Sequence, residues 1–225
     1  MCGIVGYIGS QQAAPLLLEG LSRLEHRGYD SAGLAVLGTG LKVVKKAGRV
    51  RDLGNDLPKR FTGKVGIGHT RWATHGPAND VNAHPHVDAK GDVAVVHNGI
   101  IDNAAHLRQQ LTDDGVDLAS DTDTEVLAHL IARSTAATLE ERVAEALSHI
   151  EGTYGIAAML IGFTGDGDRF ANRDRYASYN GTAPVEFSSG GRIVHRLSTR
   201  GNRNVNNALH IAAICQLRQL RCAGR

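Results

Sequence analysis

The order of two hydrophobic patterns along the chain constrains its fold more than any other feature. Short apolar runs of strand length, interrupted by one helical pattern, come first; three amphipathic helical patterns follow, and then a last strand-like run. The links between them are mostly short, which favours stacked sheets with helices outside. We therefore predict an α+β fold. The expected strands are 4–8, 33–37, 41–46, 65–70, 93–97 and 155–161, and the expected helices are 15–24, 104–111, 124–134 and 139–150.

Charge divides the chain into two unequal parts. The whole chain carries a net charge of +2, with 25 Lys plus Arg against 23 Asp plus Glu. After residue 161, ten arginines and no lysine stand against four acidic residues, whereas the preceding part is net negative. A change in both the sign of the charge and the choice of basic residue predicts a boundary between two segments of different origin.

Neither a membrane span nor a signal peptide is evident. No apolar run approaches the roughly 18 residues of a span, and the N-terminus lacks a basic region and a cleavage site. We therefore expect a cytoplasmic protein with no membrane partner. Cys2, Cys215 and Cys222 are too few and too unevenly spread for a disulfide framework. No metal is expected, because no pair has the spacing of a zinc site among His26, His69, His84, His86 and His97.

Cys2 is the residue with the most chemical content. Methionine is usually removed when the second residue is small, and removal of Met1 would leave a cysteine with a free α-amino group. Such an amine has a pKa of about 7.7–8.0, so near neutrality it can take the proton of the neighbouring thiol without a histidine partner. Gly3 lets the backbone approach closely, because it carries no Cβ. Taken alone, a cysteine here is more often simply a small residue near a frayed terminus.

Further motifs favour the catalytic interpretation of Cys2. They are Cys2–Gly6, His26–Gly33, Gly68–Gly76, Asn82–His86, His97–Asn103, Ser120–Glu125 and Glu151–Ile156. In identity and order these motifs resemble those of the class II glutamine amidotransferases, which are N-terminal-nucleophile hydrolases, and the resemblance covers residues 1–156. Within that family the motif sequences are similar to those of the glutamine–fructose-6-phosphate aminotransferases, and less similar to those of the purine-pathway members or the asparagine synthetases.

The resemblance implies a binding site for L-glutamine. A guanidinium can hold a carboxylate through two parallel hydrogen bonds, and Arg71 stands at the family's position for the α-carboxylate. Asp123 matches the residue that binds the α-ammonium group, and Thr74 and His75 resemble residues that line the pocket. Trp72 resembles the family's gate on the ammonia path. Outside such motifs, an arginine is usually a surface residue and a lone tryptophan usually packs in a core.

Asn98 and Gly99 follow directly on an apolar run. Attack by a thiolate forms an oxyanion, and the loss of one preorganised donor to it costs about 10²–10³ in rate. The side-chain amide of Asn98 and the backbone N–H of Gly99 match the family's oxyanion hole. An Asn-Gly pair after a strand is also typical of a tight turn, and the two interpretations are compatible. Asp121, and less so Asp123, could instead cap the helix that begins near Thr124.

The resemblance implies an activity, a fold and a limit. The activity is hydrolysis of glutamine to glutamate and ammonia through a thioester on Cys2, with no cofactor. The fold is the four-layer αββα sandwich of N-terminal-nucleophile hydrolases without its last strands, although the apolar run 157–163 could continue the strand begun at Gly155. The related enzymes continue into two sugar-phosphate isomerase domains, for which the 69 residues after residue 156 are too few. We therefore do not expect this chain alone to make glucosamine 6-phosphate.

A second set of motifs lies in residues 157–225, which we call the tail. The motifs are Tyr176–Pro184, Ser188–Gly191 and His195–Arg203. They resemble the C-terminal domain of insertion-sequence transposases that also carry a RuvC-like nuclease domain. The resemblance implies a small, mostly helical segment with a helix over 205–213, and a vestigial nucleophile at Ser188 or Ser189. The ten arginines after residue 161 are typical of a nucleic-acid backbone binder, or equally of a solvated surface.

Three hypotheses for the function follow. The chain is a glutaminase derived from an amino-sugar-forming enzyme, a nucleic-acid-binding protein that acts through its arginine-rich tail, or an inactive product of a gene fusion. Glutamate release that depends on Cys2 distinguishes the first, and binding that weakens with salt distinguishes the second. The third predicts no cooperative unfolding transition and a tendency to aggregate through unpaired edge strands. The sequence makes no prediction about the oligomeric state.

Overall fold

The computed structural model describes residues 2–160, 184–189 and 192–197. The chain divides into two compact units, Met1–Gly167 and Asp168–Arg225. In the described residues, the first unit holds two antiparallel sheets with helices, which confirms the predicted α+β class, and the second holds a two-stranded sheet. No helix in these described ranges is long and apolar enough to cross a membrane.

The first sheet has four antiparallel strands in the order β1-β4-β2-β3. Strand β4 lies inside it and pairs with β1 so that Thr70 faces Gly3, and with β2 so that Arg71 faces Ser31. Strands β2 and β3 form a hairpin around Gly38–Gly40 and pair along their length. The bounds are β1 Gly3–Ile8, β2 Ser31–Leu37, β3 Leu41–Ala47 and β4 Val65–Arg71, with helices α1 Ala13–Leu24, η1 Glu25–Arg27 and α2 Val50–Asn55.

Helix α1 packs against the first sheet because its leucines repeat at helical spacing. Leu17 and Leu21 are fully buried, and burial of each such side chain stabilises the fold by about 1.5–3 kcal/mol. The helix approaches β4 closely, since two glycines of that strand present no side chain. A Cβ on Gly66 would lie 2.7 Å from Leu17 Cδ1, and one on Gly68 would lie 3.1 Å from Leu21 Cδ1. These glycines therefore set how near the helix lies to the sheet.

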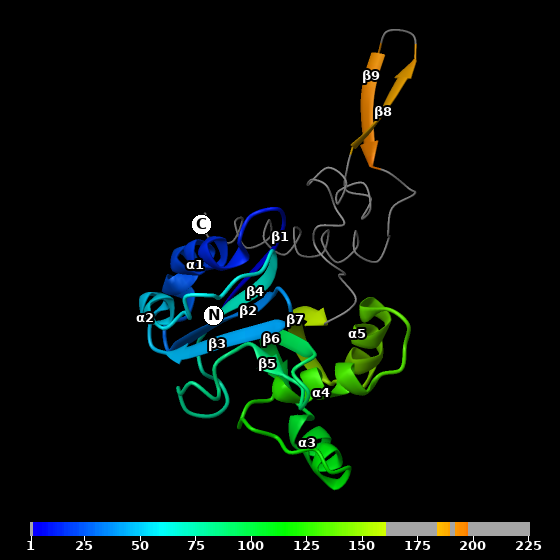
Figure 1. Cartoon of the computed structure of the whole chain (residues 1–225). Helices are drawn as coiled ribbons and strands as arrows, with labels where there is room; N and C mark the ends of the chain where they lie inside the picture. The colour runs from blue at the N-terminus through cyan, green and yellow to red at the C-terminus, as the bar shows by residue number, and fades with distance from the viewer. Residues whose placement is uncertain (1, 161–183, 190–191, 198–225) are drawn as a thin grey trace, which may run out of the picture. The chain divides into compact units, whose positions relative to one another are not determined.

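The second sheet has three antiparallel strands in the order β5-β6-β7. Helices α3, α4 and α5 pack against its outer face, on the opposite side of the unit from α1 and α2 (Figure 1). The bounds are β5 His86–Val87, β6 Val93–Ile101, β7 Gly152–Leu160, α3 Ala104–Asp113, α4 Glu125–Arg133 and α5 Leu139–Ser148. All the expected strands and helices of this unit are present, whereas the sequence does not predict α2 or β5.

Strand β6 is buried on both faces, which explains its unbroken apolar run. Val93 and Val95 pack in the core shared with α3, α4 and α5. Ala94 and Val96, which alternate with them, pack against Ile67 and other residues of the first sheet. Because successive side chains of a strand point to opposite faces, one strand contributes to two cores. The elements thus lie in the order helices, sheet, sheet, helices.

The helix starts of the second layer differ in part from prediction. Asp121 does not cap α4: Thr124 stands at the N-cap without a side-chain cap hydrogen bond, and Asp121 Oδ2 instead accepts from Asn82 Nδ2 at 3.1 Å. Asn103 stands at the N-cap of α3, also without a side-chain cap hydrogen bond, because its amide donates to the carbonyl of His149 and accepts from the backbone nitrogen of Glu151. Helix α5 begins with a capping box between Thr138 and Glu141. Asp121 and Asn103 join separate segments, and this fixes the loops.

Strand β7 runs through the position where the first resemblance was expected to end. It pairs with β6 along nine residues, from Gly152 opposite Ile101 to Leu160 opposite Val93. The expected continuation of the strand over 157–163 is confirmed as far as Leu160, and the remaining residues of that run lie outside the described ones. Met159, which follows the expected boundary, is 3% exposed and packs between the two sheets.

The second unit is described only over a β-hairpin. Strands β8 Pro184–Ser189 and β9 Arg192–Leu197 pair antiparallel. The prediction of a mostly helical segment is wrong for these residues, because Gly190-Gly191 between two β-prone runs is a hairpin signal. Ser188 and Ser189 both lie in β8. The helix expected over 205–213 lies outside the described residues.

Candidate active site

Cys2 lies just before β1, where that strand meets the end of β4. Its Sγ lies 3.2 Å from the backbone nitrogen of Trp72, which donates to it, and 3.6 Å from the carbonyl oxygen of Trp72. Gly3 is needed for this approach, since a Cβ there would lie 2.8 Å from Leu24 Cβ and 2.9 Å from Thr70 Oγ1. The half-buried thiol is therefore held at the edge of the first sheet.

Asn98 brings the second sheet onto Cys2. Its Nδ2 donates to the carbonyl oxygen of Cys2 at 3.3 Å, although the two residues are 96 positions apart. Its Oδ1 lies 2.9 Å from Nε2 of His69, in β4. The amide thus joins both sheets, and it has a second Nδ2 hydrogen that neither contact uses.

Gly99 follows Asn98 in a conformation that requires glycine. Its φ is +148°, and a Cβ there would overlap the carbonyl oxygen of Thr153 in β7. The same oxygen lies 3.2 Å from Nε2 of His97, so the strand beneath Gly99 is fixed by a side chain. The structure therefore places the predicted pair Asn98–Gly99 at a constrained end of β6, with Asn98 in contact with Cys2.

Arg71 organises the loop that follows β4. It is 3% exposed, and its guanidinium donates to three successive main-chain carbonyls, those of His75, Gly76 and Pro77. Its Nη1 also lies 3.9 Å from Oδ1 of Asp30. The sequence does not predict this role of Asp30, although the residue stands inside one of the quoted motifs. Arg71 directly precedes Trp72, whose backbone nitrogen donates to the Cys2 thiol. The buried guanidinium is therefore the cationic part of the site.

The lip of the site is aromatic and open. Trp72 is 49% exposed and Tyr29 is 53% exposed. Their rings meet edge to face with centroids 5.4 Å apart, which is a favourable geometry for aromatic pairs. Thr74 is exposed and its hydroxyl lies 3.3 Å from Nδ1 of the half-buried His75. The alternative of core packing for Trp72 is therefore not observed, since the ring lies at the surface.

Asp123 contacts the last residue of β6. It is 6% exposed, and its Oδ2 accepts from the backbone nitrogen of Ile101 at 2.9 Å. Its Oδ1 accepts from Thr124 at 3.4 Å. The carboxylate is thus fixed two residues beyond Gly99 and does not cap α4 through any described contact. Its place near the end of β6 is compatible with the predicted binding of an ammonium group.

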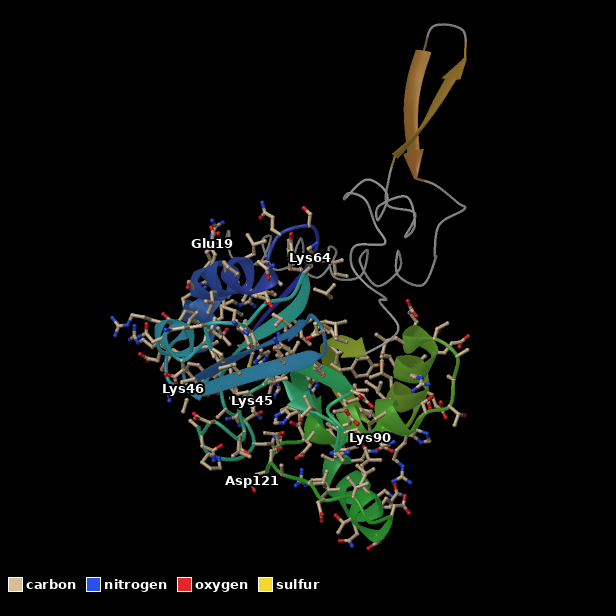
Figure 2. All side chains as sticks on the ribbon, viewed as in Figure 1. Glu19, Lys45, Lys46, Lys64, Lys90 and Asp121 are labelled. Carbon is tan, nitrogen blue, oxygen red and sulfur yellow. The ribbon has the colours of Figure 1, made fainter. Side chains whose placement is uncertain are left out.

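Strand β3 and the segment before α4 hold the loop between β4 and β5 in place. Lys45 of β3 donates from Nζ to the carbonyl oxygen of Val81 at 2.6 Å, and burial lowers the pKa of this amine to about 8. Asp80 Oδ1 accepts from the backbone of β3, and Asn82 bonds Asp121. Figure 2 labels Lys45 and Asp121 on the segments that flank this loop. The loop that carries the predicted pocket residues is therefore anchored.

Four buried histidines run behind the site. The rings of His69 and His84 stack with centroids 4.3 Å apart, and His86 meets His84 edge to face at 4.7 Å. Burial lowers the pKa of His69 to about 4 and that of His86 to about 3, and it lowers the pKa of His84 well below its usual value. His84 Nδ1 accepts from the backbone nitrogen of His97 at 3.4 Å. These rings are neutral at pH 7, and we name them the histidine row.

The histidine row ends on a second buried network. His86 Nε2 lies 2.9 Å from the hydroxyl of Thr122, which in turn lies 3.0 Å from that of Ser120. Glu125 accepts from the Ser120 hydroxyl at 2.7 Å and from two backbone N–H groups. Burial alone would raise the pKa of Glu125, but the nearby His129 and these hydrogen bonds lower it to about 2. Among the described residues, no group of three or more His, Cys, Asp or Glu is placed to hold a metal ion.

Two family models match parts of this chain, and the matched ranges overlap. The family described as "Glutamine amidotransferase domain" matches residues 69–180. The family described as "Transposase IS116/IS110/IS902 family" matches residues 144–223. Both matches cover residues 144–180, on either side of the boundary predicted at 156, so that boundary stays a prediction. The first match, together with the site around Cys2, places the first unit of the chain in the class II glutamine amidotransferase family.

The curated relatives identify the branch of that family. The chain is 46% identical over 218 residues to glutamine–fructose-6-phosphate aminotransferase (isomerizing) of Chlorobaculum tepidum, covering 86% of this chain and 35% of the relative. It is 50% identical over 163 residues to the enzyme of the same name from Aquifex aeolicus, covering 72% and 28%. The amidotransferase domain is thus of the type found in these aminotransferases. The chain spans about a third of their length.

A solved structure supports the same fold. Glutamine phosphoribosylpyrophosphate amidotransferase from B. subtilis matches with a TM-score of 0.62 and 33% identity, covering 71% of this chain and 35% of that one. A second structure, an allosteric regulatory enzyme of purine biosynthesis, matches with a TM-score of 0.61 and the same identity and coverage. The arrangement of two antiparallel sheets with helices is therefore shared with known amidotransferases.

Proposed function

We propose that the chain hydrolyses glutamine to glutamate and ammonia, with Cys2 as the nucleophile after removal of Met1. The observation that carries the proposal is the contact of Cys2 with both sheets. Its thiol accepts from the backbone of Trp72 and its carbonyl accepts from Asn98. A thiol and a candidate oxyanion donor thus converge near the chain's start.

The chemistry needs no group beyond the residues of this site. The α-amine of Cys2 takes the thiol proton, and the sulfur attacks the side-chain amide carbon of glutamine. The carbonyl oxygen gains negative charge, which Asn98 Nδ2 and the N–H of Gly99 stabilise. The C–N bond breaks, the amine proton passes to the leaving nitrogen, and ammonia departs from a thioester. Water then attacks the thioester carbon, which releases glutamate and restores the thiol.

Glutamine is held by charge at its other end. We propose that Arg71 attracts the α-carboxylate, because its buried guanidinium acts in a low-dielectric environment where a charge-assisted bond is strong. Asp123 binds the α-ammonium group, and Thr74 and His75 line the pocket. Trp72 lies over the path by which ammonia leaves. The fold that presents these groups is the four-layer αββα sandwich of N-terminal-nucleophile hydrolases.

Intact mass measurement of the purified chain tests the proposal. Met1 should be absent, and a diazoketone analogue of glutamine should add once, at Cys2, with excess glutamine blocking the reaction. Cys2→Ala should abolish both the adduct and glutamate release. The matched control is the double variant Cys215→Ala/Cys222→Ala, which should keep both. Retained Met1, or an adduct that survives Cys2→Ala, contradicts the mechanism.

Nucleic-acid binding is a second candidate function, favoured by the transposase family match over residues 144–223. The ten arginines after residue 161 supply the charge for phosphate contacts. Binding to a DNA duplex should then weaken steeply between 50 and 200 mM salt, by about 10³-fold or more if six phosphates are contacted. Binding that does not depend on salt, or no binding at low salt, contradicts this candidate. Its failure leaves the glutaminase proposal untouched.

A further inference from the structure

The Asn98 amide is held at both of its ends. Its Oδ1 lies 2.9 Å from His69 Nε2, and its Nδ2 donates to the carbonyl oxygen of Cys2 at 3.3 Å. An amide oxygen can only accept and a carbonyl can only accept, so both contacts require the same orientation of the amide. His69 must therefore donate from Nε2. His69 itself is fully buried in β4, where its ring cannot turn into solvent.

We propose that His69 is a positioning residue, whose Nε2–H turns the Asn98 amide so that its N–H donors face the glutamine carbonyl that Cys2 attacks. This inference rests on the proposed function. Rotation of the amide by half a turn would exchange Nδ2 for Oδ1 and direct a lone pair at the developing oxyanion. The same rotation would set Oδ1 against the Cys2 carbonyl. An imidazole that donates to Oδ1 removes this alternative.

The surroundings of His69 select the tautomer that the proposal needs. Among the described residues its Nδ1 has no hydrogen-bond partner, and a buried N–H without an acceptor is more costly than an unused lone pair. A proton on Nδ1 instead of Nε2 would also place the Nε2 lone pair against Oδ1 of Asn98. His84 stacks on the ring at 4.3 Å and limits its movement. Burial keeps the ring neutral at pH 7.

The experiment compares two replacements of His69 in the full chain. His69→Leu keeps the size and removes the donor, and it should lower kcat for glutamate release about 10²-fold with KM for glutamine unchanged, because the loss falls on an oxyanion donor. His69→Gln places an amide N–H near the position of Nε2 and should restore kcat to within about tenfold of the original chain. The control His86→Leu removes a buried imidazole of the same row that does not touch Asn98, and it should leave kcat within about twofold.

A second readout separates positioning from folding. Iodoacetamide alkylates a thiolate by displacement at carbon, with no oxyanion, so the rate of Cys2 alkylation should be the same in His69→Leu and the original chain. Equal losses of kcat and alkylation, without rescue by Gln, would show a merely structural role and overturn the proposal. Unchanged kcat in folded His69→Leu would overturn it as well.

The assignment can also be decided without activity. Nitrogen NMR of histidine-labelled protein should show His69 neutral and protonated at Nε2. A spectrum with the proton on Nδ1, or a cationic ring at pH 7, overturns the proposal. Failure of the original chain to release glutamate would instead contradict the proposed function, and the spectrum would still decide the state of His69.

Discussion

Acid should destabilise the first unit of this protein at a higher pH than protonation of its carboxylates alone would. The perturbation is a change from pH 8 to pH 5, and the groups that respond are the imidazoles of the histidine row. Burial lowers the pKa of His69 to about 4 and that of His86 to about 3. In the unfolded chain the same side chains have pKa values of about 6.5. The native state therefore binds fewer protons than the unfolded state across this range.

The sign and size of the effect follow from proton linkage. A histidine whose pKa is lowered by folding stabilises the native state fully above about pH 6.5, and this stability is lost as the pH falls toward the folded pKa. At pH 5 the unfolded forms of His69 and His86 are mostly protonated and the native forms are not. Each histidine then lowers the free energy of unfolding by about 2 kcal/mol relative to pH 8, so the pair lowers it by about 4 kcal/mol. This is a large share of the roughly 5–15 kcal/mol of a typical domain.

Urea unfolding at the two pH values measures the loss directly. Trp72 is the only tryptophan in the chain and its fluorescence reports on the first unit. His86→Gln, which cannot titrate, should reduce the pH dependence by about 2 kcal/mol whatever its effect at pH 8. His106→Gln, on an exposed position of α3, is the matched control and should keep the original dependence. Equal free energies of unfolding at pH 8 and pH 5 would refute the argument from burial. Glu125 does not confuse the result, because its pKa is lowered to about 2 and its contribution is lost only below about pH 4.5.

Three substitutions test other parts of the site. Gly99→Ala should lower glutamate release at least 10²-fold and reduce the melting temperature, because the new Cβ would overlap the Thr153 carbonyl oxygen at a φ of +148°; a native-like rate in a steady-state assay would contradict this. Glu125→Gln should reduce the free energy of unfolding by about 2 kcal/mol, since the amide cannot accept all the bonds that the carboxylate accepts, and urea titration will show it. Asp30→Ala should raise KM for glutamine about tenfold with a smaller change in kcat, because the loop after Arg71 loses an anchor; an unchanged KM would show that the loop is held without it.

The sequence predicts the regular elements of the first unit because each has enough residues to show a period. The apolar run of β6 indicates a strand buried on both faces, and the structure explains it by two cores on opposite sides. Helix α2 and strand β5 are missed because six and two residues are too few for a period. The hairpin of the tail is missed although Gly190-Gly191 signals it, because the resemblance implied helices.

The candidate site is predictable in its residues but not in its contacts. Cys2, Asn98 and Arg71 stand in motifs that can be read along the chain. The bond between Asn98 and Cys2 depends on how two sheets pack, and that is decided by side chains from four strands. For His69 the sequence predicts only that it holds no metal, since a lone histidine in a strand carries no signal of its partner. Its neighbour Arg71 is expected to hold a carboxylate, and the structure adds that it also closes the loop at His75 to Pro77.

The register in which β7 pairs with β6 shows which residues support the strand that carries Asn98 and Gly99. Asn98 and Gly99 face Gly155 and Tyr154, which precede the predicted boundary at 156, whereas Val93 to Val96 face residues 157–160, which follow it. The proposed oxyanion donors therefore pair with residues that precede the predicted boundary. The strand that carries them, however, is also paired and buried by residues of the tail. Met159 adds its side chain to the core between the sheets. A chain ended at residue 156 would keep every proposed catalytic residue, but Val93 to Val96, four of the nine residues of β6, would lose β7 as their partner. The first residues of the tail therefore belong physically to the first unit, whatever their origin.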